Sequence, residues 1–258
     1  MIQVIFILTS LLSTFQVSSL EEAKVPPKRD WSFNHMLGTF DRAAAQRGYK
    51  VYRQVCSTCH SLRHVRYRHL EKIGFSKAEV KAIAAEYQVR DGPNDEGEMF
   101  DRPGNPSDRF VTPYKNKKAA EAANDGSYPP DLSLITKARA GGADYLYALL
   151  TGYQESPPAG IDLVPGKYYN PYFPGGQIAM VPPLIEGVVL YEDGTLATPN
   201  QMAHDVTTFL AWASEPELEE RRRLGVQWLI FLTAFAFICY LVKRSYWRPL
   251  SQKVTKKK

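Results

Sequence analysis

Three residues with reactive side chains lie close together in the segment VCSTCHSL: Cys56, Cys59 and His60. Two thiols three residues apart can form a redox-active disulfide, share a metal ion with further ligands, or bond covalently to an organic group. A thioredoxin-like disulfide belongs to a βαβ unit, and the sequence predicts no such unit before Cys56. A structural zinc site needs a second ligand pair. The third cysteine, Cys239, lies within an apolar segment and cannot supply it.

Covalent attachment of haem c explains the motif best, because C-x-x-C-H is the signature of that attachment. Thiols at positions i and i+3 lie on one helical face, so each can add to a haem vinyl group while the next residue reaches the iron. The sequence therefore predicts one covalent haem c, with Cys56 and Cys59 as thioether links and His60 as an iron ligand. The second ring nitrogen of His60 is expected to donate to a backbone carbonyl.

A second iron ligand is expected on the other face of the haem. The candidates are His35, His64, His69, His204, Met36, Met99, Met180 and Met202. Met180 is favoured because it lies in NPYFPGGQIAMVPPL, where four prolines restrict φ and reduce the entropy lost when the loop is ordered. Met99 remains an alternative. His/Met ligation raises the reduction potential and leaves no open coordination position on the iron. Both properties suit electron transfer, and the second argues against a peroxidase.

Two apolar segments predict how the chain is organised around this site. Residues 1–19 have the length and the small-residue ending of a secretory signal peptide. Residues 225–242 carry no charge, and 18 residues of helix span ~27 Å, close to the thickness of a bilayer core. We therefore expect a periplasmic haem c domain over residues 20–224, a transmembrane anchor over 225–242 and a basic cytoplasmic tail over 243–258.

The charge distribution agrees with this division. The formal net charge is +5, but residues 21–223 hold 25 basic and 27 acidic side chains, a net charge of −2. The other seven basic residues follow the apolar segment, where no acid accompanies them. Because the larger basic cluster follows the span, the tail is expected on the cytoplasmic side of the membrane and the large domain on the opposite side. The charge gives no support for nucleic-acid binding.

Helical patterns are few in the predicted outer domain. Apolar spacing predicts helices near residues 40–55, 76–87, 141–153 and 201–213, and the second opens with a capping box of Ser76 and Glu79. Asp193 and Gly194, between short apolar runs, predict a β-hairpin. Residues 89–131 show little periodicity and are expected to form one long functional loop.

Several segments besides CSTCH resemble the cytochrome c1 family, the haem-bearing subunits of ubiquinol–cytochrome c reductase (the cytochrome bc1 complex). They are RPGNPSDRF, AANDGSYPPDLSLITKARAGGADYLYALLTGY, YNPYFPGGQIAMVPPL and YEDGTLAT, followed by the terminal anchor. The resemblance extends from about Trp31 to Trp247. It implies a mainly α fold: a class I c-type cytochrome core with long ordered loops and a small β-hairpin, plus one C-terminal transmembrane helix.

The resemblance also implies roles for individual residues. Cys56 and Cys59 would carry the thioethers, with His60 as the proximal ligand and Met180 as the distal ligand. The residues implied to line the haem crevice or to bind its edge are Pro129, Pro130, Asn124, Arg139 and Tyr145, with Arg139 paired to a haem propionate. The acids implied to dock a basic cytochrome c are Asp91, Asp95, Glu96, Glu98 and Asp101.

The function implied by the resemblance is electron transfer. A Rieske [2Fe–2S] protein would reduce the haem, cytochrome c would accept the electron, and cytochrome b would lie beside the membrane helix. The chain would be a carrier on its own and part of an enzyme only within the complex. Two alternatives stay open: a membrane-anchored monohaem cytochrome c of another respiratory chain, and a haem catalyst.

The signal-like N-terminus favours the inner (cell) membrane of a bacterium over the mitochondrial inner membrane. Some bacterial members of the family carry an additional disulfide in the haem domain. Here only Cys239 remains, so that disulfide is not expected, and the domain resembles the compact mitochondrial form.

Overall fold

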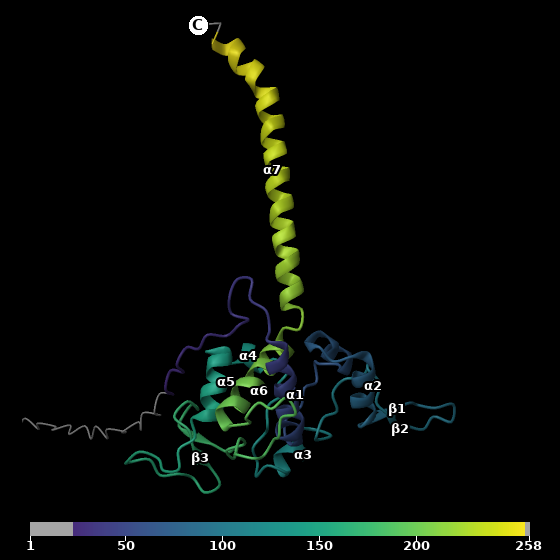
Figure 1. The fold of residues 1–258 in the computed structure, drawn as a ribbon, viewed down its shortest axis with the longest axis vertical. Helices are drawn as coiled ribbons and strands as arrows, with labels where there is room; N and C mark the ends of the chain where they lie inside the picture. The colour runs from purple at the N-terminus through teal and green to yellow at the C-terminus, as the bar shows by residue number, and fades with distance from the viewer. Residues whose placement is uncertain (1–22, 256–258) are drawn as a thin grey trace, which may run out of the picture.

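The computed structural model describes residues 23–255, with side chains to residue 248, so the predicted signal peptide lies outside the described residues. A mainly helical domain carries one long helix, α7 (Leu218–Thr255), which projects from it without contacting it along most of its length (Figure 1). The apolar part of α7 is not buried against any other element, and Leu218–Arg248 is long and apolar enough to cross a membrane. The expected C-terminal anchor is thus one continuous helix.

The elements of the domain confirm the mainly α class with small β-hairpins. In chain order they are α1 (Arg42–Gln54), η1 (Cys56–Thr58), η2 (Tyr67–Ile73), α2 (Lys77–Ala85), β1 (Gln88–Asp91), β2 (Phe100–Pro103), α3 (Lys117–Ala122), α4 (Ile135–Ala138), α5 (Gly142–Thr151), β3 (Tyr168–Tyr169), β4 (Gln177–Ile178) and α6 (Pro199–Ser214). The four predicted helices are α1, α2, α5 and α6. The capping box of α2 is present, since Ser76 and Glu79 exchange backbone and side-chain hydrogen bonds.

Helix α6 forms the centre of the domain. The sequence predicts one apolar face, yet nearly every residue from Met202 to Ser214 is buried, including Thr207 and Thr208. Helix α1 crosses α6 at Gly48, where a Cβ atom would lie 2.0 Å from the carbonyl oxygen of Asp205. Only glycine permits this approach, so the crossing of α1 and α6 depends on one residue type at one position.

A buried ion pair fastens the same crossing. Nε and Nη2 of Arg47 bind the two carboxylate oxygens of Asp205 at 2.9 and 3.1 Å, and Nη1 binds Asp193 at 2.9 Å. The side chain of Asp205 is fully buried and also accepts from Gln201. Burial by itself would raise the pKa of Asp205, but hydrogen bonds from His204 and Arg47 outweigh it and lower that pKa.

The prediction of a β-hairpin at Asp193 and Gly194 was wrong, because residues 188–198 contain only a turn. The carboxylate of Asp193 accepts from the backbone of Thr195 and binds Arg47 of α1, so the segment packs on the helices instead of folding back on itself.

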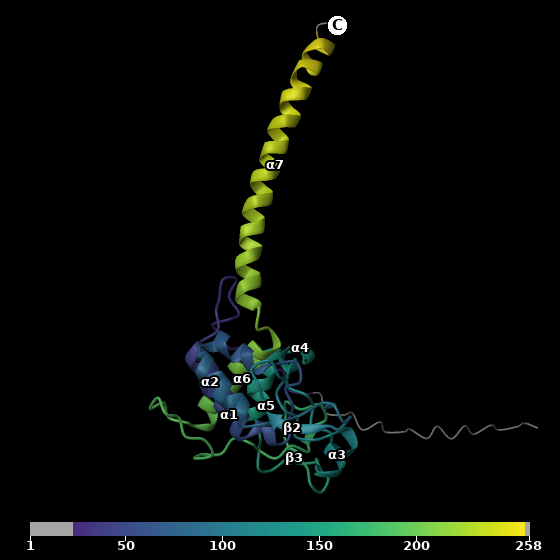
Figure 2. The same cartoon turned by 90° about the vertical axis from the view of Figure 1, so that its right-hand side faces the viewer.

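The hairpins lie elsewhere. Antiparallel strands β3 and β4 pair next to Met180. Strands β1 and β2 pair between residues 88 and 103, so part of the predicted long loop of residues 89–131 is a hairpin. The hairpin of β1 and β2 stands out from one side of the domain in Figure 1, and Figure 2 views the domain from that side. Its side chains are mostly exposed, so it has no alternation of buried and exposed residues that could reveal it in the sequence.

Replacing Arg47 with methionine should cost about 3–5 kcal/mol of unfolding free energy, because Asp205 would stay buried without its counter-ion. In the parent, the stability that this pair contributes is present above the ordinary aspartate pKa of about 4 and is lost as the pH falls below it. In the variant the pKa of Asp205 should rise, so the difference from the parent should shrink as the pH falls from 7.5 towards 4.5. Urea unfolding at both pH values measures this.

The matched control is Lys50→Met, on the same helix. Lys50 pairs with Glu192, whose side chain is 93% exposed, so its loss should lower stability far less than the loss of Arg47 does. Equal effects of the two substitutions would contradict the role given to the buried pair.

Candidate haem-binding site

The C-x-x-C-H motif begins two residues after the end of α1. Helix α1 is capped at its start by Asp41, which accepts from the backbone of Ala44 at 3.0 Å. Cys56 opens the short turn η1, and its carbonyl accepts from Cys59 at 3.1 Å and His60 at 2.8 Å. Both thiols are free and partly buried. They therefore lie on one tight turn, in the arrangement that two thioether bonds to one porphyrin require.

His60 is oriented by a backbone carbonyl. Its Nδ1 lies 2.8 Å from the carbonyl oxygen of Pro130. Because a carbonyl can only accept, Nδ1 must carry the proton, which leaves a lone pair on Nε2. Burial lowers the pKa of His60, against the opposing effects of Pro130 and Asp131, and so favours the neutral imidazole that binds metals. The prediction that a carbonyl would hold the second ring nitrogen is confirmed.

Asp131 joins the segment after the motif to the segment that supplies Pro130. One carboxylate oxygen accepts from Ser61 Oγ at 2.7 Å and from the backbone of Arg63 at 3.0 Å, and the other accepts from the backbone of Ser133 at 2.9 Å. The backbone of Leu132 donates to Ser61 at 2.8 Å. Burial alone would raise the pKa of Asp131, but these hydrogen bonds lower it to about 2. Asp131 was not among the site residues predicted from the sequence; its position directly after the proline pair was the available signal.

Met180 follows the β3–β4 hairpin, which is fixed to the end of α5. The buried Asn170 donates to the carbonyl of Leu149 in α5 at 2.8 Å, and the ring of Tyr172 packs where a Cβ of Gly152 would otherwise lie. Tyr153 donates its hydroxyl to the carbonyl oxygen of Met180 at 3.0 Å. The predicted rigid loop is thus held by hydrogen bonds as well as by its prolines, and the side chain of Met180 is partly buried.

Three other ligand candidates have different surroundings. Met202 is fully buried in α6 as a core residue. Met36 is 86% exposed on a loop beside α7. His69 accepts a hydrogen bond from the backbone of Arg66 and completes the cap of η2.

The remaining crevice candidates differ in how closely the structure groups them. Pro129 and Pro130 are partly buried, and Pro130 contacts His60 as described. Arg139 is exposed. Burial raises the pKa of Tyr145, and the charge and hydrogen bond of Arg139 offset part of that rise. Asn124 follows the end of α3 and donates to Tyr114 Oη and to the carbonyl of Ala120 within that helix. These contacts give Asn124 a local structural role.

The acids predicted to dock a partner fall into two groups. Asp91 and Asp101 lie in the paired strands β1 and β2, and each binds an arginine: Asp91 binds Arg102 at 2.5 Å and Asp101 binds Arg90 at 3.5 Å. The acids of the turn between the strands are exposed, and no cation is paired with them in the described part of the chain: Asp95, Glu96 and Glu98. The available negative charge is therefore concentrated at the tip of the hairpin.

Two free thiols on one turn, a neutral imidazole with an unpaired Nε2 and a long exposed apolar helix are typical of a membrane-anchored cytochrome of the c type. The donor set fits haem c: two sulfurs to bond the porphyrin, one nitrogen for the iron and a thioether on a separate rigid loop. The family model described as the cytochrome C1 family matches residues 31–250, and the chain belongs to this family.

Relatives from three groups of organisms agree. Over 251 residues the chain is 51% identical to "Cytochrome c1 1, heme protein, mitochondrial" of Arabidopsis thaliana, covering 96% of this chain and 80% of the relative. It is 48% identical over 237 residues to "Cytochrome b-c1 complex catalytic subunit, mitochondrial" of Candida albicans, covering 92% of this chain and 82% of the relative. A "Cytochrome b/c1" of Bradyrhizobium diazoefficiens is 45% identical over 258 residues, covering 90% of this chain and 38% of the relative. The chain is therefore a membrane-anchored haem c subunit of the cytochrome bc1 complex, with a role in electron transfer.

Replacing Asp131 with alanine should leave four donors without their acceptor: Ser61 Oγ, the backbone N–H of Ser133, and the backbone N–H and Nε of Arg63. Unsatisfied buried donors cost about 1–3 kcal/mol, which corresponds to a fall in the thermal midpoint of roughly 2–12 °C. Because Pro130 is adjacent, the orientation of His60 should also become heterogeneous and broaden the electron paramagnetic resonance signal of the oxidised haem. Asp162→Ala, at an exposed position, is the control; a narrow signal in both variants would contradict the positioning role.

Proposed function

We propose that this chain takes one electron at a time from a Rieske [2Fe–2S] protein and passes it to cytochrome c, with cytochrome b as the neighbour of α7. Membership of the cytochrome c1 family supports the proposal, as do the names of the relatives from Candida and Bradyrhizobium. The observation that carries it is His60, whose Nδ1 proton is committed to Pro130 and whose Nε2 is left unpaired beside two free thiols. The bound haem supplies a one-electron redox centre.

The residues of the chain hold that centre and keep other ligands from it. Cys56 and Cys59 would form the thioether links, and His60 Nε2 and Met180 would bind the iron. With two ligands from the protein, the iron would be closed to water and small molecules. A fixed ligand set also limits rearrangement when the charge changes. Arg139 would neutralise a propionate, since a guanidinium fork matches a carboxylate.

The proposed topology places residues 20–224 on one side of the membrane and the basic residues 243–258 on the other. The excess of basic residues after the span favours a cytoplasmic tail and a periplasmic haem domain. Together with the signal-like segment 1–19, this supports a bacterial cell membrane. The mitochondrial relatives make the mitochondrial inner membrane the alternative, in which case the haem domain would face the intermembrane space. The N-terminal residue of the mature chain, read by mass spectrometry, would distinguish the two targeting routes.

The distal ligand is tested by replacing Met180 with leucine in the purified complex. The oxidised protein should lose its methionine–iron absorption band in the red, and the reduction potential should fall by a sizeable part of the about 0.8 V over which axial ligands tune haem. Met99→Leu is the matched control, because Met99 is an exposed methionine of the β1–β2 hairpin segment. A change in Met99→Leu alone would transfer the ligand role to Met99.

The acidic tip of the hairpin is tested by the triple substitution Asp95→Asn, Glu96→Gln and Glu98→Gln. Because complementary charge accelerates encounter, the second-order rate of cytochrome c reduction at low salt should fall several-fold. The dependence of this rate on ionic strength should also become shallower. Stopped-flow kinetics at 10 and 200 mM salt measure both quantities.

The control for this experiment removes the same charge elsewhere. Glu71, Glu155 and Asp162 are exposed acids outside the hairpin. Their neutralisation should leave the rate at low salt nearly unchanged. If both triple variants slow the reaction equally, net charge and not the hairpin tip would account for the effect.

A further inference from the structure

A loop beside the membrane helix presents exposed apolar side chains in a fixed position. Residues 34–38 form the tip of this loop, called here the membrane-side loop. Met36 is 86% exposed and Leu37 is 73% exposed. In both views the loop rises from the domain beside the first turns of α7 (Figures 1 and 2). Exposed apolar residues that adjoin a membrane-spanning helix differ from scattered surface ones, since the same bilayer can cover both.

Buried aromatic residues fix the base of this loop. Trp31, Phe33 and Phe40 are at most 7% exposed; Trp31 stacks on Phe33, and Phe33 packs against Phe40. The loop closes tightly, because a Cβ on Gly38 would lie 2.2 Å from the carbonyl oxygen of Ser32. The tip is therefore held out by packed residues on both sides and is not a frayed segment.

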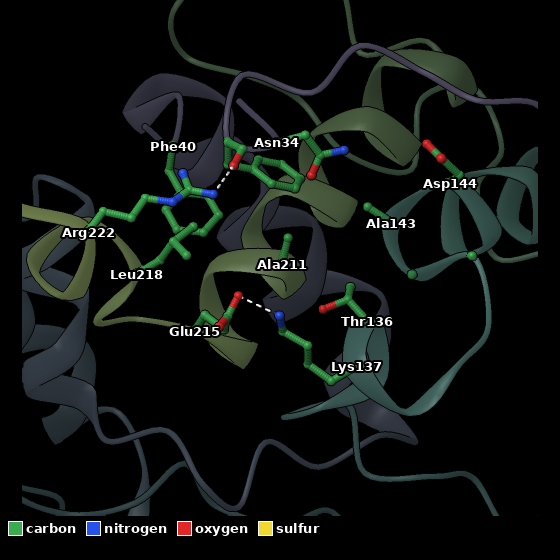
Figure 3. A pocket seen from close by; sticks show the side chains of 13 residues that line it. Asn34, Phe40, Thr136, Lys137, Ala143, Asp144, Ala211, Glu215, Leu218 and Arg222 are labelled. Carbon is green, nitrogen blue, oxygen red and sulfur yellow. Dashed lines mark hydrogen bonds and ion pairs between the residues drawn. The ribbon is translucent and has the colours of Figure 1, made fainter. Parts of the chain in front are cut away.

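Helix α7 binds both ends of the loop. Arg222 donates to the carbonyls of Gly38 at 2.6 Å and Phe33 at 3.0 Å, and it points toward the loop across the hollow shown in Figure 3. Glu219 accepts from the backbone of Phe40 at 2.8 Å and binds Arg42 through both oxygens. The position of the loop along α7 is thus set by two successive turns of that helix.

The loop reaches the level at which the apolar part of α7 begins. Leu37 lines one surface hollow with Arg222, Arg223, Val226 and Gln227. Helix α7 rises about 4.5 Å from Arg223 to Val226, so Leu37 stands where the basic turn gives way to the uncharged segment. Arginines at the end of a span lie among lipid headgroups, and an apolar side chain beside them would enter the boundary of the acyl chains.

We propose that Met36 and Leu37 insert into the bilayer leaflet nearest the haem domain and form a second membrane contact beside α7. The occupant of this surface is phospholipid. The basic residues Arg222 and Arg223 next to the tip favour anionic headgroups there. A single helix would let the domain swivel and tilt, whereas a helix with an inserted loop next to it resists tilt in one direction.

The test attaches an NBD fluorophore to Leu37→Cys in a Cys239→Ser background, in the complete complex reconstituted into phosphatidylcholine vesicles. Lipids with a nitroxide near the top of the acyl chain should quench the emission at least twofold, while aqueous iodide should quench it little. The matched control is Leu196→Cys, which is 78% exposed and precedes α6, at the end of that helix opposite to α7. Iodide should quench this control and the lipid nitroxide should not.

Each other outcome overturns the proposal. Quenching of residue 37 by iodide as strong as that of residue 196 would leave the loop in water. Protection of residue 37 from both quenchers would mean that another subunit covers the loop. Adding anionic phosphatidylglycerol to the vesicles should deepen lipid quenching at residue 37 and leave residue 196 unchanged.

Discussion

The hydrogen bond between His60 Nδ1 and the carbonyl oxygen of Pro130 is the contact on which the site depends, because it joins two segments 70 residues apart. Before Pro130 comes an irregular segment, and after it Asp131 binds Ser61 and the backbone of Arg63. The backbone of His64 adds a bond to Ser133 Oγ at 3.0 Å. The two segments are thus joined over several residues by hydrogen bonds from backbone and side-chain donors, although neither segment forms a β-strand there. This pairing orients the imidazole of His60 on a segment without regular secondary structure.

The pairing also explains why rigidity is divided unevenly in this domain. The core of helices α1 and α6 is held by apolar burial, a glycine crossing and one buried ion pair. The parts that would face the haem are loops, and loops carry backbone groups that need partners when they are buried. Asn170, Asp131 and Tyr153 supply those partners at three separate points. At these points polar side chains supply the hydrogen-bond partners that regular structure provides elsewhere.

The features that could be predicted from the sequence are those defined by residues close together in the chain. The C-x-x-C-H spacing, the capping box of Ser76 and Glu79 and the uncharged segment of α7 each depend on neighbours within a few positions. The contacts that it did not reveal join distant segments: Arg47 with Asp205 and Asp131 with Ser61. The misplaced hairpin has the same origin. Asp193 and Gly194 do form a turn, but Arg47 binds the aspartate against α1. Strands β1 and β2 have no buried face, so their sequences lack the alternation of apolar and polar residues that predicts a strand.

The same helices link the membrane to the haem motif. Glu219 of α7 binds Arg42 at the start of α1, and Cys56 lies two residues beyond its end. Helix α1 has 13 residues, so at 1.5 Å per residue it separates these two points by about 20 Å. Because only three residues separate α6 from α7, and α6 packs against α1, this separation cannot change without breaking the crossing at Gly48. The distance along α1 from its contact with the membrane anchor to the C-x-x-C-H motif is therefore set by the length of that helix.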